Sequence, residues 1–190
     1  DEKNATINDK RISGTFFDLG FSLFHNAKKL IENGSGPYFY LPKLEHYLEC
    51  RLLNDVILFC EKKLGLEIGT VKVTVLIETI NAVFQMDEFL WELKDHIVGL
   101  NAGRWDYLFS YQKVYRNTKK VILPDRSKVN MFVPFMSNYN KLLVDTCHKR
   151  GAFGMGGMSA QVIAKANPKE INEKALAGVK KDKERELNQG

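Results

Sequence analysis

The feature that most constrains the fold is a regular alternation between short apolar runs and longer segments with helical spacing. Four apolar runs are expected to be strands, at residues 37–43, 71–78, 96–101 and 152–157. Helices are expected over residues 11–34, 44–66, 79–95, 132–151 and 167–190. The aromatic content of residues 107–115 would allow a strand, but their position after a loop favours a helix. Strand and helix alternating four times over predicts right-handed βαβ units and a parallel sheet.

The number of expected strands limits the choice among α/β folds. The run 71–78 is β-branched and almost continuously apolar, as expected of a strand that is buried on both faces. A closed (β/α)8 TIM barrel needs eight strands, twice the number expected here. The chain is therefore either a small open sheet or about four consecutive βα units of a barrel whose other strands are missing.

Charge and hydropathy argue against two classes of partner. The net charge is +5, but the basic residues are scattered, and the one dense charge run, residues 180–186, alternates in sign. Such a run is typical of a solvated helix face rather than of an arm that binds nucleic acid. There is no run of about eighteen apolar residues, so we expect no membrane span. Cys50, Cys60 and Cys147 form no paired motif, which predicts free thiols in a reducing compartment.

Polar residues follow the expected strands at the edge where parallel α/β folds bind their ligands. Lys43 follows the first strand and Glu78 follows the second. Asp106 lies in the loop after the third, next to Trp105. Because neighbouring parallel strands end at one edge, Glu78 and Asp106 are expected side by side. Lys43 is expected to face the same pocket in an electrostatic role.

Two adjacent carboxylates repel each other unless a proton or a cation lies between them. Two oxygen ligands from side chains, with room for water and substrate oxygens, is the usual way in which proteins hold Mg²⁺. The alternative for Glu78 is that it caps the helix that follows it, as an acid near a helix start often does. Spacing alone leaves both interpretations open.

The loop before Asp106 suggests an anion site. Asn101 and Gly103 tolerate positive φ, and successive backbone N–H groups could then point into one concavity and bind an anion. The alternative is an ordinary turn. An anion held beside Mg²⁺ would suggest a substrate carboxylate that is bound by both.

Residues 94–109, KDHIVGLNAGRWDYLF, resemble the signature of the malate synthase family in its A-type, short form. Every required position of that signature matches. Further blocks of the same family appear in the same order, at residues 36–43, 76–88, 123–126 and 147–158. The resemblance covers about residues 11–190 and is far more specific than a lone glycine motif.

This resemblance implies a (β/α)8 TIM barrel that condenses glyoxylate with acetyl-CoA and hydrolyses the thioester, giving malate and CoA in the glyoxylate cycle. It implies Mg²⁺ as the cofactor, with Glu78 and Asp106 as its two carboxylate ligands. It also implies that the backbone of Gly103, Arg104, Trp105 and Asp106 holds the glyoxylate carboxylate. For such an enzyme we expect the cytoplasm in a bacterium and the peroxisome or glyoxysome in a eukaryote.

The family also has parts that residues 1–190 do not contain. Its catalytic Arg lies upstream of the matching blocks and its catalytic Asp, the base, lies downstream. We therefore expect residues 1–190 to be part of the catalytic barrel domain, with the N-terminal and C-terminal portions of a parent protein missing, and to be inactive alone. Two alternatives remain: a structural fragment without activity, and another Mg²⁺-dependent acyl-CoA lyase of the citrate-lyase-like kind.

Overall fold

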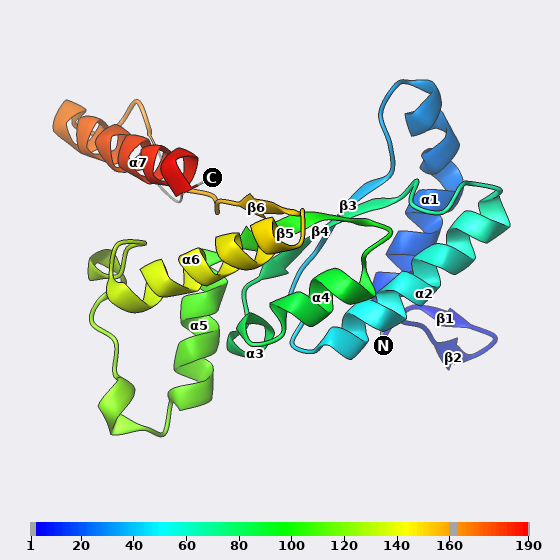
Figure 1. Cartoon of the computed structure of the whole chain (residues 1–190), viewed down its shortest axis with the longest axis horizontal. Coiled ribbons are helices and arrows are strands. Elements are labelled where there is room, and N and C mark those ends of the chain that lie inside the picture. The colour runs from blue at the N-terminus through cyan, green and yellow to red at the C-terminus, as the bar shows by residue number, and fades with distance from the viewer. Residues whose placement is uncertain (1–2, 160–162, 190) are drawn as a thin grey trace.

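The computed structural model describes residues 3–159 and 163–189 and confirms the expected parallel sheet. Its strands are β3 (Tyr38–Leu41), β4 (Lys72–Ile77), β5 (Ile97–Ala102) and β6 (Phe153–Met155). They pair in parallel in the order β3-β4-β5-β6 (Figure 1). Each strand is added beside the previous one without a reversal of direction along the sheet. That order is typical of a barrel and differs from a doubly wound sheet, where the strand order reverses.

One face of the sheet is covered by helices. Helices α2 (Tyr47–Leu64), α4 (Met86–Glu92) and α6 (Pro134–Lys149) lie side by side along it (Figure 1). Alternate residues of β4, Val73, Val75 and Ile77, are completely buried against this layer. A fully buried side chain of this size stabilises the fold by about 1.5–3 kcal/mol relative to an exposed one.

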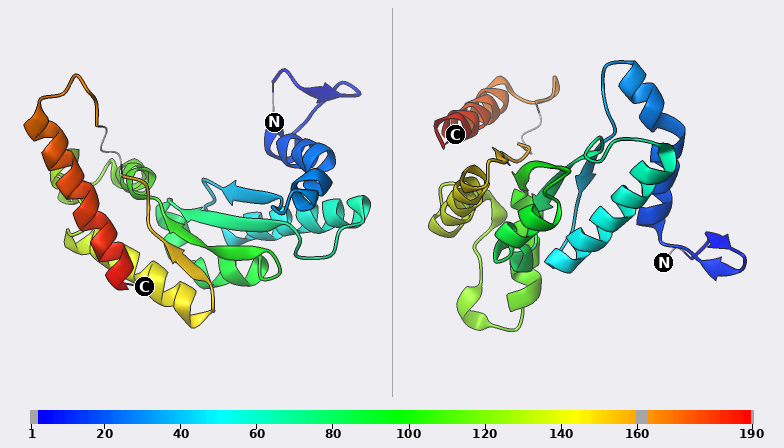
Figure 2. Two further views of the ribbon diagram at one scale, coloured as in Figure 1. Left: turned by 90° about the horizontal axis from the view of Figure 1, so that it is seen from above. Right: turned by 45° about the vertical axis from the view of Figure 1, so that its right-hand side comes forward.

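The other face of the sheet is open. Tyr38 and Tyr40 of β3 are 66% and 50% exposed, and Phe153 of β6 is 69% exposed. Together with Lys72 and Thr74 of β4, the two tyrosines line a shallow hollow of about 470 Å³. The expectation that β4 is buried on both faces is therefore only partly right. Seen from above, the chain forms an open arc with α1 (Gly14–Glu32) at one end and α7 (Lys169–Gln189) at the other (Figure 2).

The helices match the expected segments with one correction. Residues 79–95 do not form one helix but two short ones, α3 (Ile80–Val83) and α4. The break occurs at Gln85, whose side-chain amide is tied to the start of α2: its Oε1 accepts from the N–H of Tyr47 at 3.1 Å. Helix α5 (Arg104–Tyr115) confirms the helix expected over 107–115 and begins earlier.

Several smaller elements were not expected. An antiparallel hairpin of β1 (Thr6–Ile7) and β2 (Lys10–Arg11) precedes α1. Two 3-10 turns, η1 (Lys119–Val121) and η2 (Arg126–Lys128), lie between α5 and α6. None of these elements joins the parallel sheet.

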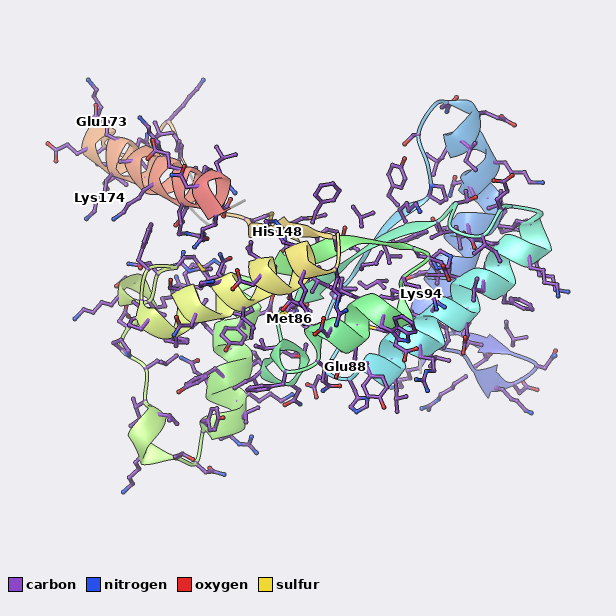
Figure 3. The ribbon with its side chains drawn as sticks, in the orientation of Figure 1. Met86, Glu88, Lys94, His148, Glu173 and Lys174 are labelled. Carbon is purple, nitrogen blue, oxygen red and sulfur yellow. The ribbon has the colours of Figure 1, made fainter. Side chains whose placement is uncertain are left out.

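The charge run 180–186 is not simply a solvated helix face, which corrects the expectation. Arg185 and Glu186 are 10% and 18% exposed, and the Lys183 ammonium donates to the carbonyl of Gly157 at 3.3 Å. Arg185 also lies over the ring of Phe132. This half of α7 packs on the turn after β6, whereas the half that carries Glu173 and Lys174 extends away from the body (Figure 3).

A buried polar cluster closes the opposite end of the sheet, where the strands begin. Glu61 of α2 and His96, just before β5, are both completely buried, and Nε2 of His96 lies 3.0 Å from Oε2 of Glu61. The other Glu61 oxygen accepts from the N–H of Val71 at 2.8 Å, and Nδ1 of His96 lies 2.8 Å from Oδ1 of Asn54. The cluster satisfies polar groups that would be costly to bury alone, and it joins α2 to the starts of β4 and β5.

The helices and the cysteines bear on two further expectations from the sequence, that there is no membrane span and that the thiols are free. Across the described ranges, no helix is long and apolar enough to cross a membrane. Cys50, Cys60 and Cys147 are free thiols, as expected.

The aromatic face of α1 is exposed. Leu19, Leu23 and Ala27 are its buried residues, whereas Phe17, Phe21 and Phe24 are 47%, 57% and 71% exposed. Contiguous apolar surface of this kind is typical of contact sites between proteins or domains.

We predict that residues 1–190, expressed alone, self-associate through exposed apolar surface and open sheet edges. Size-exclusion chromatography with light scattering should show a mass above that of a monomer. Replacing Phe17, Phe21 and Phe24 together by Ser should reduce the association, because these exposed side chains form the apolar face of α1. The fold should be retained, because they are not part of the buried core. A monodisperse monomer that melts cooperatively would contradict the prediction.

Candidate active site at the carboxyl edge of the sheet

Three strands deliver the polar residues of the candidate site to one edge. Lys43 follows β3, Glu78 follows β4 directly, and Asp106 lies in the first turn of α5, after β5. All three line one open cavity of about 400 Å³, together with Ser110 and Lys113 of α5. The structure therefore brings together the residues that the strand-end argument selected.

One ammonium group joins the two carboxylates. Nζ of Lys43 lies 3.2 Å from Oε1 of Glu78 and 3.0 Å from Oδ1 of Asp106. The Glu78 side chain is 1% exposed, whereas those of Asp106 and Lys43 are 48% and 61% exposed. The two acids thus lie on the same side of the sheet, close enough to share one cation, as expected from the sequence.

Glu78 is anchored by backbone rather than by the helix that follows it. Its Oε1 accepts from the N–H of Lys43 at 2.7 Å. The start of α3 is capped by the neighbouring residue, because the Thr79 hydroxyl accepts from the N–H of Ala82 at 3.3 Å. The capping alternative for Glu78 is therefore not what the structure shows.

Lys43 owes its position to an unusual backbone conformation. Its φ is +62°, in the left-handed region that costs a non-glycine residue of the order of 1 kcal/mol. This conformation lets the N–H and the ammonium of one residue approach the same carboxylate. Burial by itself would lower the pKa of Lys43, but its hydrogen bonds and ion pairs with Asp106 and Glu78 outweigh burial and raise that pKa.

The positive-φ nest expected around Asn101 and Gly103 is wrong. Asn101 lies within β5, where its side-chain amide donates to the carbonyl of Gly156 at 2.9 Å. Gly103 has φ −79° and is the N-cap of α5. An anion site at this position would instead use the N–H groups of Arg104, Trp105 and Asp106, which open the helix and have no acceptor within it.

Gly103 is required here for space rather than for its φ. A Cβ at this position would lie 2.7 Å from Cβ of Glu78, closer than real carbon contacts allow. The missing side chain is what lets the start of α5 approach the buried carboxylate. The glycine therefore sets the spacing between the helix start and the first acid.

The guanidinium of Arg104 is engaged by neighbouring groups of the protein. Its guanidinium donates to the carbonyl of Val129 at 2.8 Å and lies over the Trp105 ring, 4.3 Å from the centroid. Burial lowers the pKa of Arg104, Asp182 opposes this effect, and Arg185 adds to it. Only the backbone of Arg104 and Trp105 was expected to take part in binding, and these side-chain contacts are compatible with that.

Tyr139 of α6 is a site residue that the sequence did not reveal. It is 3% exposed, its hydroxyl donates to the carbonyl of Ile77, and its ring stacks on Tyr107 at 4.2 Å. Burial raises its pKa well above the usual value, the nearby tyrosine and Glu78 add to the rise, and a hydrogen bond from the backbone of Gly103 opposes it. Tyr139 thus ties the residue before Glu78 to the residue that starts α5.

The donor set suits a hard divalent ion. Among residues 3–159 and 163–189, no three His, Cys, Asp or Glu side chains gather as a metal site. A metal at the edge of the sheet would therefore have the carboxylates of Glu78 and Asp106 and take its remaining ligands from water and substrate. That arrangement fits Mg²⁺, whereas structural zinc sites use four protein ligands.

A larger hollow, of about 790 Å³, lies over the helical layer and the starts of β5 and β6. Most of its acids are paired with arginines: Asp87 is 2.7 Å from Arg150, and Glu92 is 2.6 Å from Arg51. It is lined by no pair of unneutralised acids. The smaller cavity at the carboxyl edge therefore remains the candidate active site.

Fold and site together define a class: a β/α barrel-type protein with a carboxylate pair at the C-terminal edge of adjacent parallel strands. The family model described as "Malate synthase, TIM barrel domain" matches residues 1–190, and the chain belongs to the malate synthase family. Its four consecutive βα units are accordingly part of a TIM barrel.

Curated relatives agree with this assignment. The chain is 52% identical over 189 residues to a malate synthase of Dictyostelium discoideum, covering 100% of this chain and 35% of that protein. It is 50% identical over 189 residues to malate synthase A of Escherichia coli (strain K12), again covering 100% and 35%. The chain thus spans about a third of the length of these relatives.

Solved structures share the fold. A malate synthase of Haloferax volcanii in a pyruvate/acetyl-CoA ternary complex has a TM-score of 0.66 at 11% identity, covering 90% of this chain and 41% of that one. A citrate lyase of Burkholderia xenovorans LB400 has a TM-score of 0.61 at 19% identity, covering 78% and 42%. At these identities the likeness concerns the fold alone.

We predict that Gly103→Ala destabilises the protein by about 1–3 kcal/mol, because the new Cβ overlaps the Glu78 side chain. The thermal unfolding midpoint should fall. Gly20→Ala is the matched control, since Gly20 lies in α1 with open space around it and should gain about 0.5–1 kcal/mol from the same change. Equal shifts for both variants would contradict the packing argument.

Proposed function

We propose that the protein containing this chain is a malate synthase that condenses glyoxylate with acetyl-CoA and hydrolyses the thioester to give malate and CoA. The single observation that carries the proposal is that the carboxylates of Glu78 and Asp106 converge on one point, the Lys43 ammonium, at the edge of the sheet. Identity of about 50% to curated malate synthases over the whole chain supports it.

In this proposal Glu78 and Asp106 hold Mg²⁺. The ion would supply Lewis-acid polarisation of the aldehyde oxygen of glyoxylate. Glu78 is suited to be the fixed ligand, because it is buried and held by the Lys43 N–H. Asp106 is suited to be the adjustable ligand, since about half of its side chain is exposed to solvent.

The start of α5 is proposed to hold the glyoxylate carboxylate. The backbone N–H groups of Arg104, Trp105 and Asp106 open that helix, and the positive end of its dipole favours an anion. Gly103 presents no side chain that would block the approach. The carboxylate of the substrate would thus lie next to the pair that holds the ion, which orients the aldehyde toward it.

The remaining catalytic groups are proposed to lie outside residues 1–190. The family's base is an Asp and its enolate-stabilising residue is an Arg, and neither matches a position of this chain. The cavity would hold the ion and the glyoxylate, and acetyl-CoA would be bound with help from other parts of the protein. A citrate-lyase-like acyl-CoA lyase is the less favoured alternative, because the resemblance to a citrate lyase extends to the fold only.

We predict that Asp106→Asn in the full protein lowers kcat by on the order of 100- to 1,000-fold, the size of effect seen when one group that stabilises developing charge is removed. Glyoxylate-dependent release of CoA from acetyl-CoA, followed with a thiol reagent, measures it. Asp145→Asn is the matched control, because Asp145 is an exposed acid of α6 that pairs with Lys141, one turn earlier on the same helix.

The same assay separates the proposed enzyme from a fragment without activity and from another lyase. The full protein should release CoA only when glyoxylate is present, and residues 1–190 alone should release none. Near-native turnover of the Asp106→Asn variant would refute the assignment of the site.

A further inference from the structure

The Lys43 side chain contacts both of the acids that are proposed to hold the ion. Its ammonium is 3.0 Å from Asp106 and 3.2 Å from Glu78. The other charged residues that line the cavity are Glu45, Lys113 and Arg116. In the part of the chain that the structure describes, Lys113 and Arg116 make no ion pair with Glu78 or Asp106. Lys43 is therefore the residue that neutralises these two acids.

We propose that Lys43 is a tethered competitor for the divalent cation, so that its ammonium sets the affinity of the carboxylate pair for the ion. This inference rests on the proposed function, in which Glu78 and Asp106 hold a divalent ion. An ammonium and a divalent ion that share the same carboxylate oxygens would lie within a few ångströms of each other. Their repulsion at that range is unfavourable at any effective dielectric constant of a protein.

The structure separates the anchoring and the neutralising functions of this residue. The backbone N–H of Lys43 holds Oε1 of Glu78 at 2.7 Å, and this contact does not depend on the side chain. The side chain itself is 61% exposed and carries its charge on a flexible four-carbon stem. The ammonium can therefore leave the carboxylates while the backbone keeps Glu78 in place.

The competition has a structural purpose. Two carboxylates that converge without a cation repel each other, and one of them would turn away or bind a proton. The Lys43 ammonium keeps the pair converged, so that an arriving ion finds both ligands already oriented. The cost is that the ion must displace the ammonium. Because the Lys43 N–H holds Glu78 in place without the side chain, this cost outweighs the gain from orientation and lowers the apparent affinity.

The test is the affinity of the full protein for Mg²⁺ and Mn²⁺, measured without substrates or turnover. Isothermal titration gives the Kd for Mg²⁺, and electron paramagnetic resonance of unbound Mn²⁺ gives an independent value. Lys43→Met should bind both ions more tightly, by roughly three- to tenfold, the range expected for the loss of exposed or half-exposed ion pairs. Lys43→Gln should behave in the same way.

Lys113→Met is the matched control. It removes the same charge from the wall of the same cavity, but among the described residues Lys113 makes no ion pair with Glu78 or Asp106, so this variant should change the Kd less than twofold. Unchanged or weaker ion binding in the Lys43 variants would overturn the inference. So would an equal gain in Lys113→Met, because the effect would then be the general field of the cavity.

The two proposals fail in different ways. If the wild-type protein binds Mn²⁺ and Asp106→Asn abolishes that binding, the proposed ion site stands whatever the Lys43 variants do. If Asp106→Asn leaves Mn²⁺ binding unchanged, the ion is held elsewhere and both proposals are overturned.

Discussion

The structure around the site depends on keeping one carboxylate, that of Glu78, buried at the end of a strand. Burying a charge without partners costs several kcal/mol, so the surroundings must supply hydrogen bonds and an opposite charge. Lys43 supplies both, from its backbone and from its ammonium, at the expense of a left-handed backbone conformation. Gly103 has no side chain, which lets helix α5 start beside the Glu78 side chain. Each of these local departures from ordinary backbone and packing follows from the buried acid.

Parallel register makes this arrangement possible with residues from separate parts of the chain. Leu41, Val75 and Leu100 are successive partners across β3, β4 and β5, so the three strands end at one edge. Tyr139, far along the chain, then fixes that edge from the helical side by bonding the Ile77 carbonyl. The acids are therefore held by a frame made of sheet hydrogen bonds and one buried phenol, whereas the side chains of Lys43 and Asp106 are exposed to solvent.

The sequence predicted those parts of the fold that local periodicity controls. All four strands of the sheet and the meeting of Glu78 with Asp106 followed from apolar runs and from the rule about strand ends. What it missed depends on contacts between distant residues. The helix break at Gln85 reflects a bond to Tyr47 in another helix, and Tyr139 carries no local signal that sets it apart from other aromatic residues of its helix. The expected nest is absent because Asn101 continues β5 and its side-chain amide donates to the carbonyl of Gly156, just after the next strand.

The stretch 94–109 can now be understood as serving both ends of one strand. At the start of β5, His96 belongs to the buried cluster with Glu61, which joins helix to sheet and touches no part of the cavity. At the end of β5, Gly103 lies against the Glu78 side chain and Asp106 pairs with the Lys43 ammonium in the candidate site. In β/α barrels the N-terminal edge generally stabilises the fold and the C-terminal edge performs the chemistry. Residues 94–109 run from one edge of the sheet to the other. This stretch therefore contains residues that stabilise the fold as well as residues of the candidate site.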